Sequence, residues 1–245
     1  MASAVLIGCT GLVGSHILRN LIASEAIASI NTFSRRSPPE ASSSNKVHAF
    51  VSPDPAQWVA QITRPSAQQR PTILFSAFGT TRAAVGGSLE AQSRIDHGLQ
   101  LELAQATRQA GCRVCVLVSS STANENSWIP YARMKGRIEA DLKALQFERT
   151  VILRPGIILG NRVESRPEEW IAQSVVQGIG KVAPSWRDTL GQDAGVIAEA
   201  AVNCGLRGLE EISGKGDDGS GVWLVERGDI VKYARTGTDL SSFGA

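Results

Sequence analysis

Tyr131 and Lys135 are the two residues whose types and spacing most directly suggest chemistry. They lie four residues apart, so on a helix both side chains face the same way. A phenol beside an ammonium is favoured as phenolate, and it can then pass a proton to or from a substrate oxygen. Taken alone, the pair is better explained by an amphipathic helix with an exposed lysine. Its meaning therefore depends on what surrounds it.

A glycine-rich turn near the N-terminus supplies that context. Gly8, Gly11 and Gly14 stand between an apolar run at 4–7 and an apolar helical pattern at 12–22. There, glycines permit a tight turn, close approach of a pyrophosphate and close packing of helix on strand. The helix N-terminus presents free N–H groups to the anion, although the spacing differs from the usual GxGxxG. We expect dinucleotide contacts from Gly8, Thr10, Gly11, Leu12 and Val13.

Two arginines follow the second expected strand, about 20 residues after the glycine turn. An acidic residue at this position would accept a hydrogen bond from the ribose 2′-hydroxyl of NAD, whereas the chain has Arg35 and Arg36. A guanidinium suits a 2′-phosphate because it forms bidentate, charge-assisted hydrogen bonds. We therefore predict a preference for NADP(H). The alternative is a solvated basic pair in a loop.

Three consecutive serines end the strand that precedes the Tyr–Lys helix. One hydroxyl could hydrogen-bond a substrate carbonyl and orient it. Strand alternation implies that the three side chains do not all face the same cleft, and we favour Ser121, with Ser120 second. Ordinary capping of a strand end by serines is the alternative. Three arginines could contact a substrate anion or form structural ion pairs: Arg82, Arg94 and Arg154.

Strands alternating with helices must position these groups. Such alternation predicts a parallel sheet with helices on both faces, and right-handed crossovers place the loops after all strands on one edge. The expected strands are 4–7, 27–33, 47–51, 72–77, 113–118 and 150–153, and the expected helices are 12–22, 55–62, 88–110 and 129–145. The glycine turn, the arginines and the serines should therefore converge there with four further cofactor contacts, Phe78, Gly79, Arg154 and Pro155.

Beyond residue 160 the pattern weakens. We expect helices at 166–176 and 193–204, a Gly/Asp-rich loop at 214–221, a last strand at 222–225 and a short helix at 228–233. The chain is thus expected to form a single domain. Residues 1–160 would be the dinucleotide-binding core, and residues 161–245 a small substrate-side extension and tail.

Composition excludes several classes of function. With 25 basic and 23 acidic residues the net charge is +2, which gives no case for nucleic acid or for an anionic membrane surface. No apolar run approaches the length of a membrane span, and the first strand begins too early to leave room for a cleavable targeting peptide. No metal site is predicted, because the CxxC of Cys112 and Cys115 has no second CxxC or nearby histidine and runs into a buried strand.

Several segments together resemble the short-chain dehydrogenase/reductase superfamily. The finer similarity is to its atypical branch, which holds fungal mitochondrial-proteome proteins and a human Tat-interacting, oxidoreductase-like tumour suppressor. The segments that carry it are the glycine turn and residues 78–82, 130–139, 153–162 and 225–230, which span nearly the whole chain.

The resemblance implies a Rossmann-type doubly wound sheet, NADP(H) binding and a Ser–Tyr–Lys site at Ser121, Tyr131 and Lys135. The helix asparagine that completes a proton relay in the superfamily has no clear counterpart, and Asp96 lies in the corresponding helix. Family members occur in the cytoplasm and at the mitochondrial surface, so both locations are expected, with peripheral membrane association allowed. The long helices at 88–110 and 129–145 could form a dimer interface, and a monomer is equally compatible.

Three functions fit these expectations. The first is an NADPH-dependent reductase of a carbonyl-type small molecule, with Tyr131 as the proton donor and Lys135 holding the nicotinamide ribose. The second is a regulatory or scaffold protein that binds NADPH without turnover. The third is a redox-neutral isomerase, epimerase or cyclase in a biosynthetic pathway, which would convert its substrate with no net change in NADPH.

Overall fold

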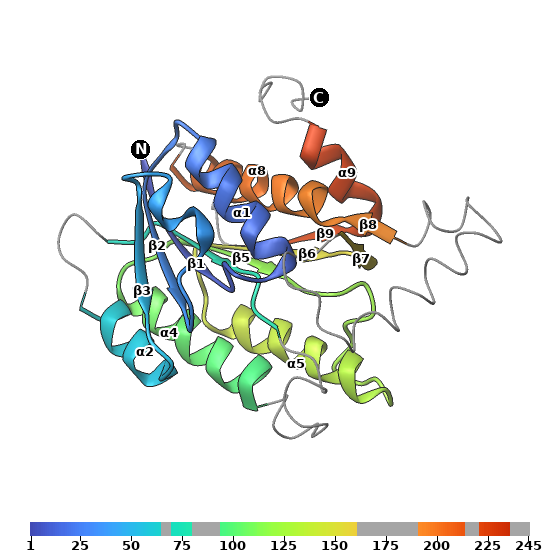
Figure 1. The fold of residues 1–245 in the computed structure, drawn as a ribbon. Helices are drawn as coiled ribbons and strands as arrows, with labels where there is room; N and C mark the ends of the chain where they lie inside the picture. Colours follow the sequence, from blue (N-terminus) through green and yellow to red (C-terminus); the bar gives the residue numbers. More distant parts are fainter. Residues whose placement is uncertain (65–69, 80–93, 161–190, 214–220, 236–245) are drawn as a thin grey trace.

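A seven-stranded parallel sheet forms the centre of the molecule, with strand order β3-β2-β1-β4-β5-β6-β9 (Figure 1). This computed structural model describes residues 1–64, 70–79, 94–160, 191–213 and 221–235. The strands are β1 (Ala2–Ile7), β2 (Ile27–Ser34), β3 (Val47–Val51), β4 (Ile73–Ser76), β5 (Val114–Val118), β6 (Arg149–Arg154) and β9 (Gly221–Glu226).

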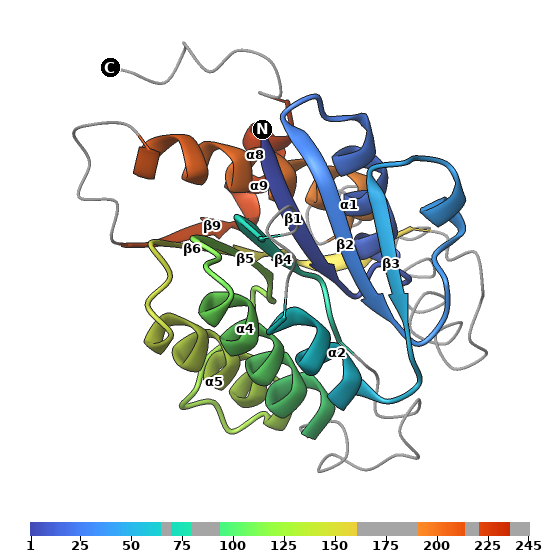
Figure 2. The same cartoon turned by 90° about the vertical axis from the view of Figure 1, so that its left-hand side faces the viewer.

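Helices cover both faces of the sheet. One face carries α1 (Leu12–Ala23), α8 (Ala194–Ser213) and α9 (Arg227–Arg235), and the other carries α2 (Pro55–Ile62), α4 (Gln100–Gln109) and α5 (Pro130–Ala144) (Figures 1 and 2). Shorter elements are a 3-10 helix η1 (Pro39–Ser42), a π-helix η4 (Arg94–Leu99) and a two-stranded parallel sheet of β7 (Ile157–Leu159) and β8 (Gly191–Asp193). This is the doubly wound α/β arrangement expected from the sequence.

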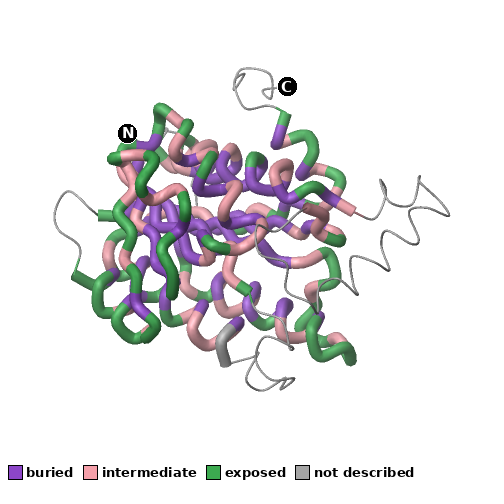
Figure 3. The backbone as a smooth tube through the Cα atoms, viewed as in Figure 1, coloured by how far each residue is buried: buried purple, intermediate pink, exposed green. Residues whose placement is uncertain are grey.

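Local sequence explains why these elements form where they do. The central strand β5 is buried along its whole length, and its sequence VCVLV is apolar throughout, as parallel strands covered on both faces are. Helix α2 begins after Asp54, whose side chain accepts a hydrogen bond from the amide of Ala56, and it has a proline in its first turn. Two apolar clusters, one on each face of the sheet, form the buried core (Figure 3).

The order of the strands fixes where a ligand edge must lie. From β1 the chain adds β2 and β3 on one side and then returns to place β4 on the other side of β1. The strand order therefore reverses between β1 and β4, and ligands of such sheets bind at the carboxyl ends of the strands there. The glycine turn follows β1, and Ala77 to Gly79 follow β4.

The expected fold class is confirmed, and all six strands expected before residue 160 are present. Three details differ from expectation. The first described turns of the helix expected at 88–110 are π-helical, helix α8 continues past residue 204 to Ser213, and β7 and β8 form a small sheet that no sequence pattern indicated. The expected helix at 166–176, the loop at 214–220 and the tail lie outside the described residues.

Candidate functional site

The glycine turn is set by close approach of backbone to backbone. Gly8 has φ +87°, and a Cβ on it would fall 2.5 Å from the carbonyl oxygen of Ala77. A Cβ on Gly14 would fall 2.0 Å from the carbonyl oxygen of Gly8. Gly11, the N-cap of α1, donates its amide to the carbonyl of Gly8 at 2.9 Å and offers no side-chain cap. The first amides of α1 are thus oriented towards the ligand edge, as an anion site requires.

The residues expected to contact the cofactor from this turn differ in their exposure. Thr10 is exposed, Leu12 is half-buried at the start of α1, and Val13 is buried in the core beneath it. Leu12 also packs against the end of β7, because a Cβ on Gly160 would lie 3.1 Å from its Cδ1. The turn therefore exposes Thr10, while the side chains of Leu12 and Val13 pack against the protein.

The segment after β4 connects the glycine turn to Lys135. A Cβ on Gly8 would meet Ala77 and Phe78, and a Cβ on the exposed Gly79 would lie 4.0 Å from the Nζ of Lys135. Lys135 is only 6% exposed, and it forms no hydrogen bond or ion pair with any other residue that the structure describes. The ammonium thus lies at the same edge of the sheet as the glycine turn.

Tyr131 lies in the first turn of α5 and is 43% exposed. The loop before the helix is fixed on α5: the amide of Asn124 donates to the carbonyl of Ala132 at 3.0 Å. A Cβ on Gly136 would fall 2.0 Å from the amide nitrogen of Glu125, so the helix and the loop touch through their backbones. The phenol is therefore presented to solvent on a well-anchored helix start, one turn from Lys135.

The three strand-end serines have three different environments. Ser119 is buried, and its hydroxyl donates to Oε1 of Glu139 at 2.6 Å. Ser120 is half-buried, with its hydroxyl 3.0 Å from that of Thr122. Ser121 is exposed and is held by its amide, which donates to the carbonyl of Pro155 at 2.8 Å. The hydroxyls of Ser120 and Ser121 are therefore the accessible ones. Because β5 ends at Val118, all three serines lie beyond the strand, and alternation does not determine where their side chains point.

Arg154, expected to contact cofactor or substrate, is bonded to protein carboxylates. Its Nε and Nη2 donate to the two oxygens of Glu139 at 3.1 and 2.6 Å, and its Nη1 donates to Glu226 at 3.1 Å. The hydrogen bonds to Glu139 raise the pKa of the Arg154 guanidinium. The guanidinium therefore links α5 to the ends of β6 and β9. Of the two alternatives given for Arg154, substrate contact or a structural ion pair, the structure shows the ion pair.

Arg35 and Arg36 follow β2 and are exposed at the ligand edge. The hydroxyl of Ser34 donates to the carbonyl of Arg36 at 2.6 Å and fixes the turn. The next acidic residue along the chain, Glu40, accepts from Arg19 of α1 at 2.9 Å. The charged groups that directly follow β2, where the ribose 2′ position of a dinucleotide is usually recognised, are therefore the two guanidiniums and no carboxylate.

Two buried polar side chains near the site, Glu139 and Gln100, were not expected to have a functional role. Glu139 appeared only within the segment that carries the family resemblance, yet it is one further turn along α5 from Lys135. Gln100 at the start of α4 donates to the hydroxyl of Ser76, at the end of β4, at 2.6 Å. Asp96 is buried in η4, and π-helical turns are common at functional sites. Tyr131, Lys135 and Glu139 follow one another at intervals of four residues, and this spacing is the sequence pattern that could have identified Glu139.

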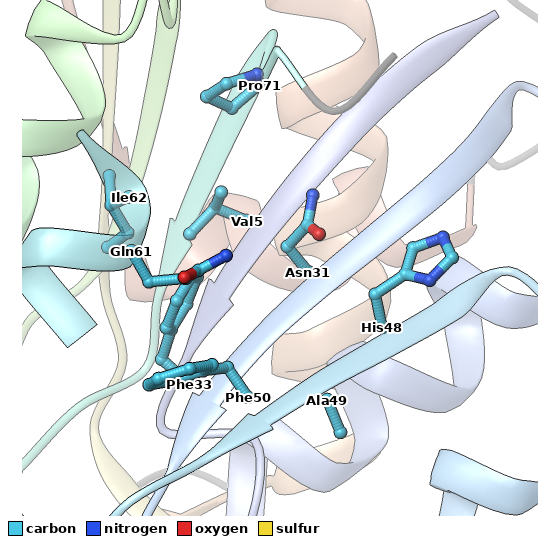
Figure 4. Close-up of a pocket in the computed structure, with 9 residues that line it drawn as sticks. All are labelled: Val5, Asn31, Phe33, His48, Ala49, Phe50, Gln61, Ile62 and Pro71. Carbon is cyan, nitrogen blue, oxygen red and sulfur yellow. The ribbon is translucent and has the colours of Figure 1, made fainter. Parts of the chain in front are cut away.

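Two cavities that are lined by described residues lie away from the glycine turn and Tyr131. One of about 330 Å³ lies on the sheet face between β2, β3 and the end of α2, where Phe33, Phe50 and Asn31 face Gln61 (Figure 4). Another of about 430 Å³ lies between β8, α8 and α9. Neither cavity is lined by the glycine turn or by Tyr131. The candidate site is instead the edge of the sheet at which the ends of β1, β4 and β5 meet.

Other expectations fall partly outside the described residues. Arg82 belongs to a segment that the structure does not describe, and the same holds for the side chain of Arg94. No group of metal-ligating side chains is found in the part of the chain that is described. Burial raises the pKa of the Cys115 thiol to about 12 and that of its neighbour Cys112 as well, as for inert core cysteines. Within the described ranges no helix is long and apolar enough to cross a membrane.

Known structures share this fold at low sequence identity. A short-chain dehydrogenase/reductase from Saccharomyces cerevisiae aligns with a TM-score of 0.66 at 13% identity, covering 95% of this chain and 99% of the other. A UDP-N-acetylglucosamine 4-epimerase from Methanobrevibacter ruminantium, in complex with UDP-N-acetylmuramic acid, aligns with a TM-score of 0.63 at 15% identity, covering 92% and 76%. MoeE5, solved with UDP-glucose and NAD, aligns with a TM-score of 0.62 at 14% identity, covering 96% and 82%. The architecture is that of the dehydrogenases and epimerases with a Rossmann-like sheet.

Sequence relatives are closer. The family model HIM1 matches residues 42–178. "Protein fmp52-1, mitochondrial" of Aspergillus terreus is 51% identical over 96% of this chain and 100% of its own length. "Protein fmp52, mitochondrial" of Aspergillus fumigatus is 49% identical over 95% of this chain and 98% of its own length. These similarities confirm the resemblance to the fungal mitochondrial-proteome branch, and the chain belongs to the Fmp52 family of mitochondrial proteins.

Proposed function

We propose that the protein is an NADPH-dependent oxidoreductase that reduces a carbonyl group of a small molecule. The observation that carries the proposal is the continuous path from the glycine turn to Lys135. Gly8 abuts Ala77, and Gly79, two residues further on, lies beside the ammonium of Lys135. A dinucleotide held at the turn would thereby extend along the edge that carries the Tyr–Lys helix.

The residues present fit a dinucleotide. Gly8 and Gly14 allow β1, the turn and α1 to pack backbone against backbone, and Gly11 begins α1 without a side-chain cap. The first amides of α1 would therefore be available to a pyrophosphate. Arg35 and Arg36 would bind the 2′-phosphate, and Lys135 would bind ribose hydroxyls. Phe78, Gly79 and Pro155 would border the nicotinamide half, whereas Arg154 would contribute only through Glu139.

Proton transfer would fall to Tyr131. NADPH, when bound, supplies a hydride to the substrate carbon. The phenol of Tyr131 would donate its proton to the carbonyl oxygen, and the ammonium of Lys135 would stabilise the phenolate that remains. Ser121 would donate a hydrogen bond to the same oxygen, with Ser120 as the alternative donor. The substrate would be held between α5 and residues of the extension at 161–245, which we propose as the substrate-side part of a single domain.

Tyr131→Phe tests this assignment. The variant should lose at least about 100-fold in the turnover number, because general acid catalysis contributes factors of this size, while it binds NADPH with unchanged affinity. NADPH binding is measured by fluorescence titration, and turnover by loss of the reduced-nicotinamide absorbance with a panel of aldehydes, ketones and quinones. An unchanged rate would remove Tyr131 from the reaction, and failure of the wild type to bind NADPH would remove the cofactor.

A redox-neutral reaction is the second candidate. Several solved structures with this fold are sugar-nucleotide 4-epimerases, which supports an isomerisation or epimerisation on the same Tyr–Lys site. The two candidates differ in one observable, because the second predicts substrate conversion with no net change in NADPH. Binding of NADPH with neither conversion nor oxidation would indicate the regulatory function instead.

The relatives' names support a mitochondrial location. We propose that the protein acts at the mitochondrial surface or in the adjoining cytoplasm, with peripheral rather than spanning attachment to any membrane. It would act as a monomer, or as a homodimer through α4 and α5. Size-exclusion chromatography with light scattering, together with fractionation of tagged protein, tests both statements.

A further inference from the structure

Glu139 and Lys135 are two buried groups of opposite charge on the same helix. Glu139 is 2% exposed on α5, one turn after Lys135, and residues four apart on a helix have Cβ atoms about 5–6 Å apart. A buried carboxylate and a buried ammonium at this spacing would be expected to pair, because each otherwise carries an uncompensated charge. They do not pair in this structure: no salt bridge joins these two described residues.

The carboxylate of Glu139 is fully engaged elsewhere. Ser119 donates to its Oε1 at 2.6 Å, and Arg154 donates to both oxygens, at 3.1 and 2.6 Å. A bidentate, charge-assisted pair with arginine is stronger and more directional than a single contact with lysine. Arg154 itself is held in place from the other side by Glu226 at 3.1 Å.

We infer that Arg154 is a positioning residue that keeps Glu139 away from Lys135, so that the ammonium stays available to the dinucleotide. This inference rests on the proposed function and deepens it, because it assigns to Arg154 an indirect role in place of direct contact. If Arg154 is removed, two lysines of α5 remain one turn from the buried carboxylate, the buried Lys135 and the half-buried Lys143. Lys135 is the expected partner, because burial leaves its ammonium less solvated than that of Lys143. The new internal pair would compete with the ligand.

Arg154→Met tests the inference, together with the double variant Arg154→Met/Glu139→Gln. In the single variant, Lys135 should pair with Glu139, and NADPH affinity should fall by about tenfold or more, which is the size of one lost hydrogen bond to a charged group. In the double variant the side chain at 139 is neutral, so affinity should return to within about threefold of the wild type. Rescue of this kind is not expected if the pair merely stabilises the fold.

Two control variants and one direct measurement complete the test. Glu226→Gln, which removes only the outer partner of Arg154, should leave affinity within about threefold of the wild type. Arg113→Met breaks an exposed Arg–Glu pair away from α5 and should change nothing in binding. A crystal structure of Arg154→Met without nucleotide gives the distance from Nζ of Lys135 to the carboxylate of Glu139.

Three outcomes would overturn the inference. Wild-type affinity in Arg154→Met would show that Lys135 remains available without Arg154. Equal weakness of the single and double variants would show that Arg154 contacts the nucleotide directly. A Glu139 carboxylate that stays away from Lys135 in the variant crystal would remove the competing pair. If the wild type binds neither NADPH nor NADH, the proposed function fails, and the crystal structure of Arg154→Met alone decides the inference.

Discussion

The two ends of the candidate site are built by different means. At the end proposed to bind the phosphates, which we call the phosphate end, backbone atoms touch backbone atoms. A Cβ on Gly14 would lie only 2.0 Å from the carbonyl oxygen of Gly8. At the end proposed for proton transfer, which we call the proton-transfer end, the middle of α5 is attached to the strand ends by polar side chains, with Glu139 bonded to Ser119 and Arg154. We therefore expect the first end to tolerate no added atom at Gly8 or Gly14, and the second end to tolerate changes that preserve hydrogen bonding and charge.

Gly14→Ala should have the largest effect and tests the phosphate end of this comparison. The added methyl group would overlap the backbone of Gly8, so α1 must move away from β1. We expect a loss of about 3 kcal/mol in the free energy of unfolding, at the upper end for overpacking, and loss of NADPH binding. Urea unfolding followed by circular dichroism measures the first, and a binding titration at low temperature measures the second.

Gly228→Ala is the matched control for that variant. Gly228 lies in α9, and a Cβ there would meet no atom within 4 Å. Alanine loses less conformational entropy than glycine on entering a helix, so the substitution should stabilise the protein by about 0.5 to 1 kcal/mol. Similar destabilisation by both variants would show that glycine content, and not the close approach at Gly14, determines the outcome.

The same contrast explains what the sequence could predict. The glycine turn is local, since the strand, the turn and the helix occupy one continuous segment, and its residues were identified from spacing alone. The bonding of Arg154 was not predictable, because Glu139 and Glu226 lie 15 and 72 residues away and nothing local indicates which carboxylate a guanidinium will choose. Likewise, the pairing of β7 with β8 joins short segments more than 30 residues apart with no apolar periodicity of their own.

Replacing both Arg35 and Arg36 by serine would sharpen the comparison. It separates two tasks of the phosphate end, binding of the pyrophosphate and preference for NADPH over NADH. If the backbone turn holds the pyrophosphate, NADH binding should be unchanged. NADPH affinity should fall by about 10- to 100-fold, because charge-assisted hydrogen bonds to the 2′-phosphate are lost. Parallel titrations with the two nucleotides at fixed ionic strength measure both values. Equal loss of NADH and NADPH would mean that the arginines hold the pyrophosphate.

Ser119→Ala probes the proton-transfer end with a smaller expected effect. The variant removes one of the donors to the buried carboxylate of Glu139 while Arg154 still bonds both oxygens. We expect a loss of about 1 to 2 kcal/mol in the free energy of unfolding, as for a hydrogen bond to a charged group, and unchanged NADPH affinity. The measurements are urea unfolding and nucleotide titration.

Ser121→Ala should show the opposite pattern, because its hydroxyl is exposed and its position is fixed by its amide. Its unfolding free energy should stay within about 0.5 kcal/mol of the wild type, as for surface substitutions, while turnover falls. Neighbouring serines would then divide the two tasks of this end of the site, with Ser119 attaching α5 to the sheet and Ser121 contacting the substrate. Loss of turnover in Ser119→Ala without loss of stability would reverse that division, because the hydroxyl bonded to Glu139 would then take part in the reaction.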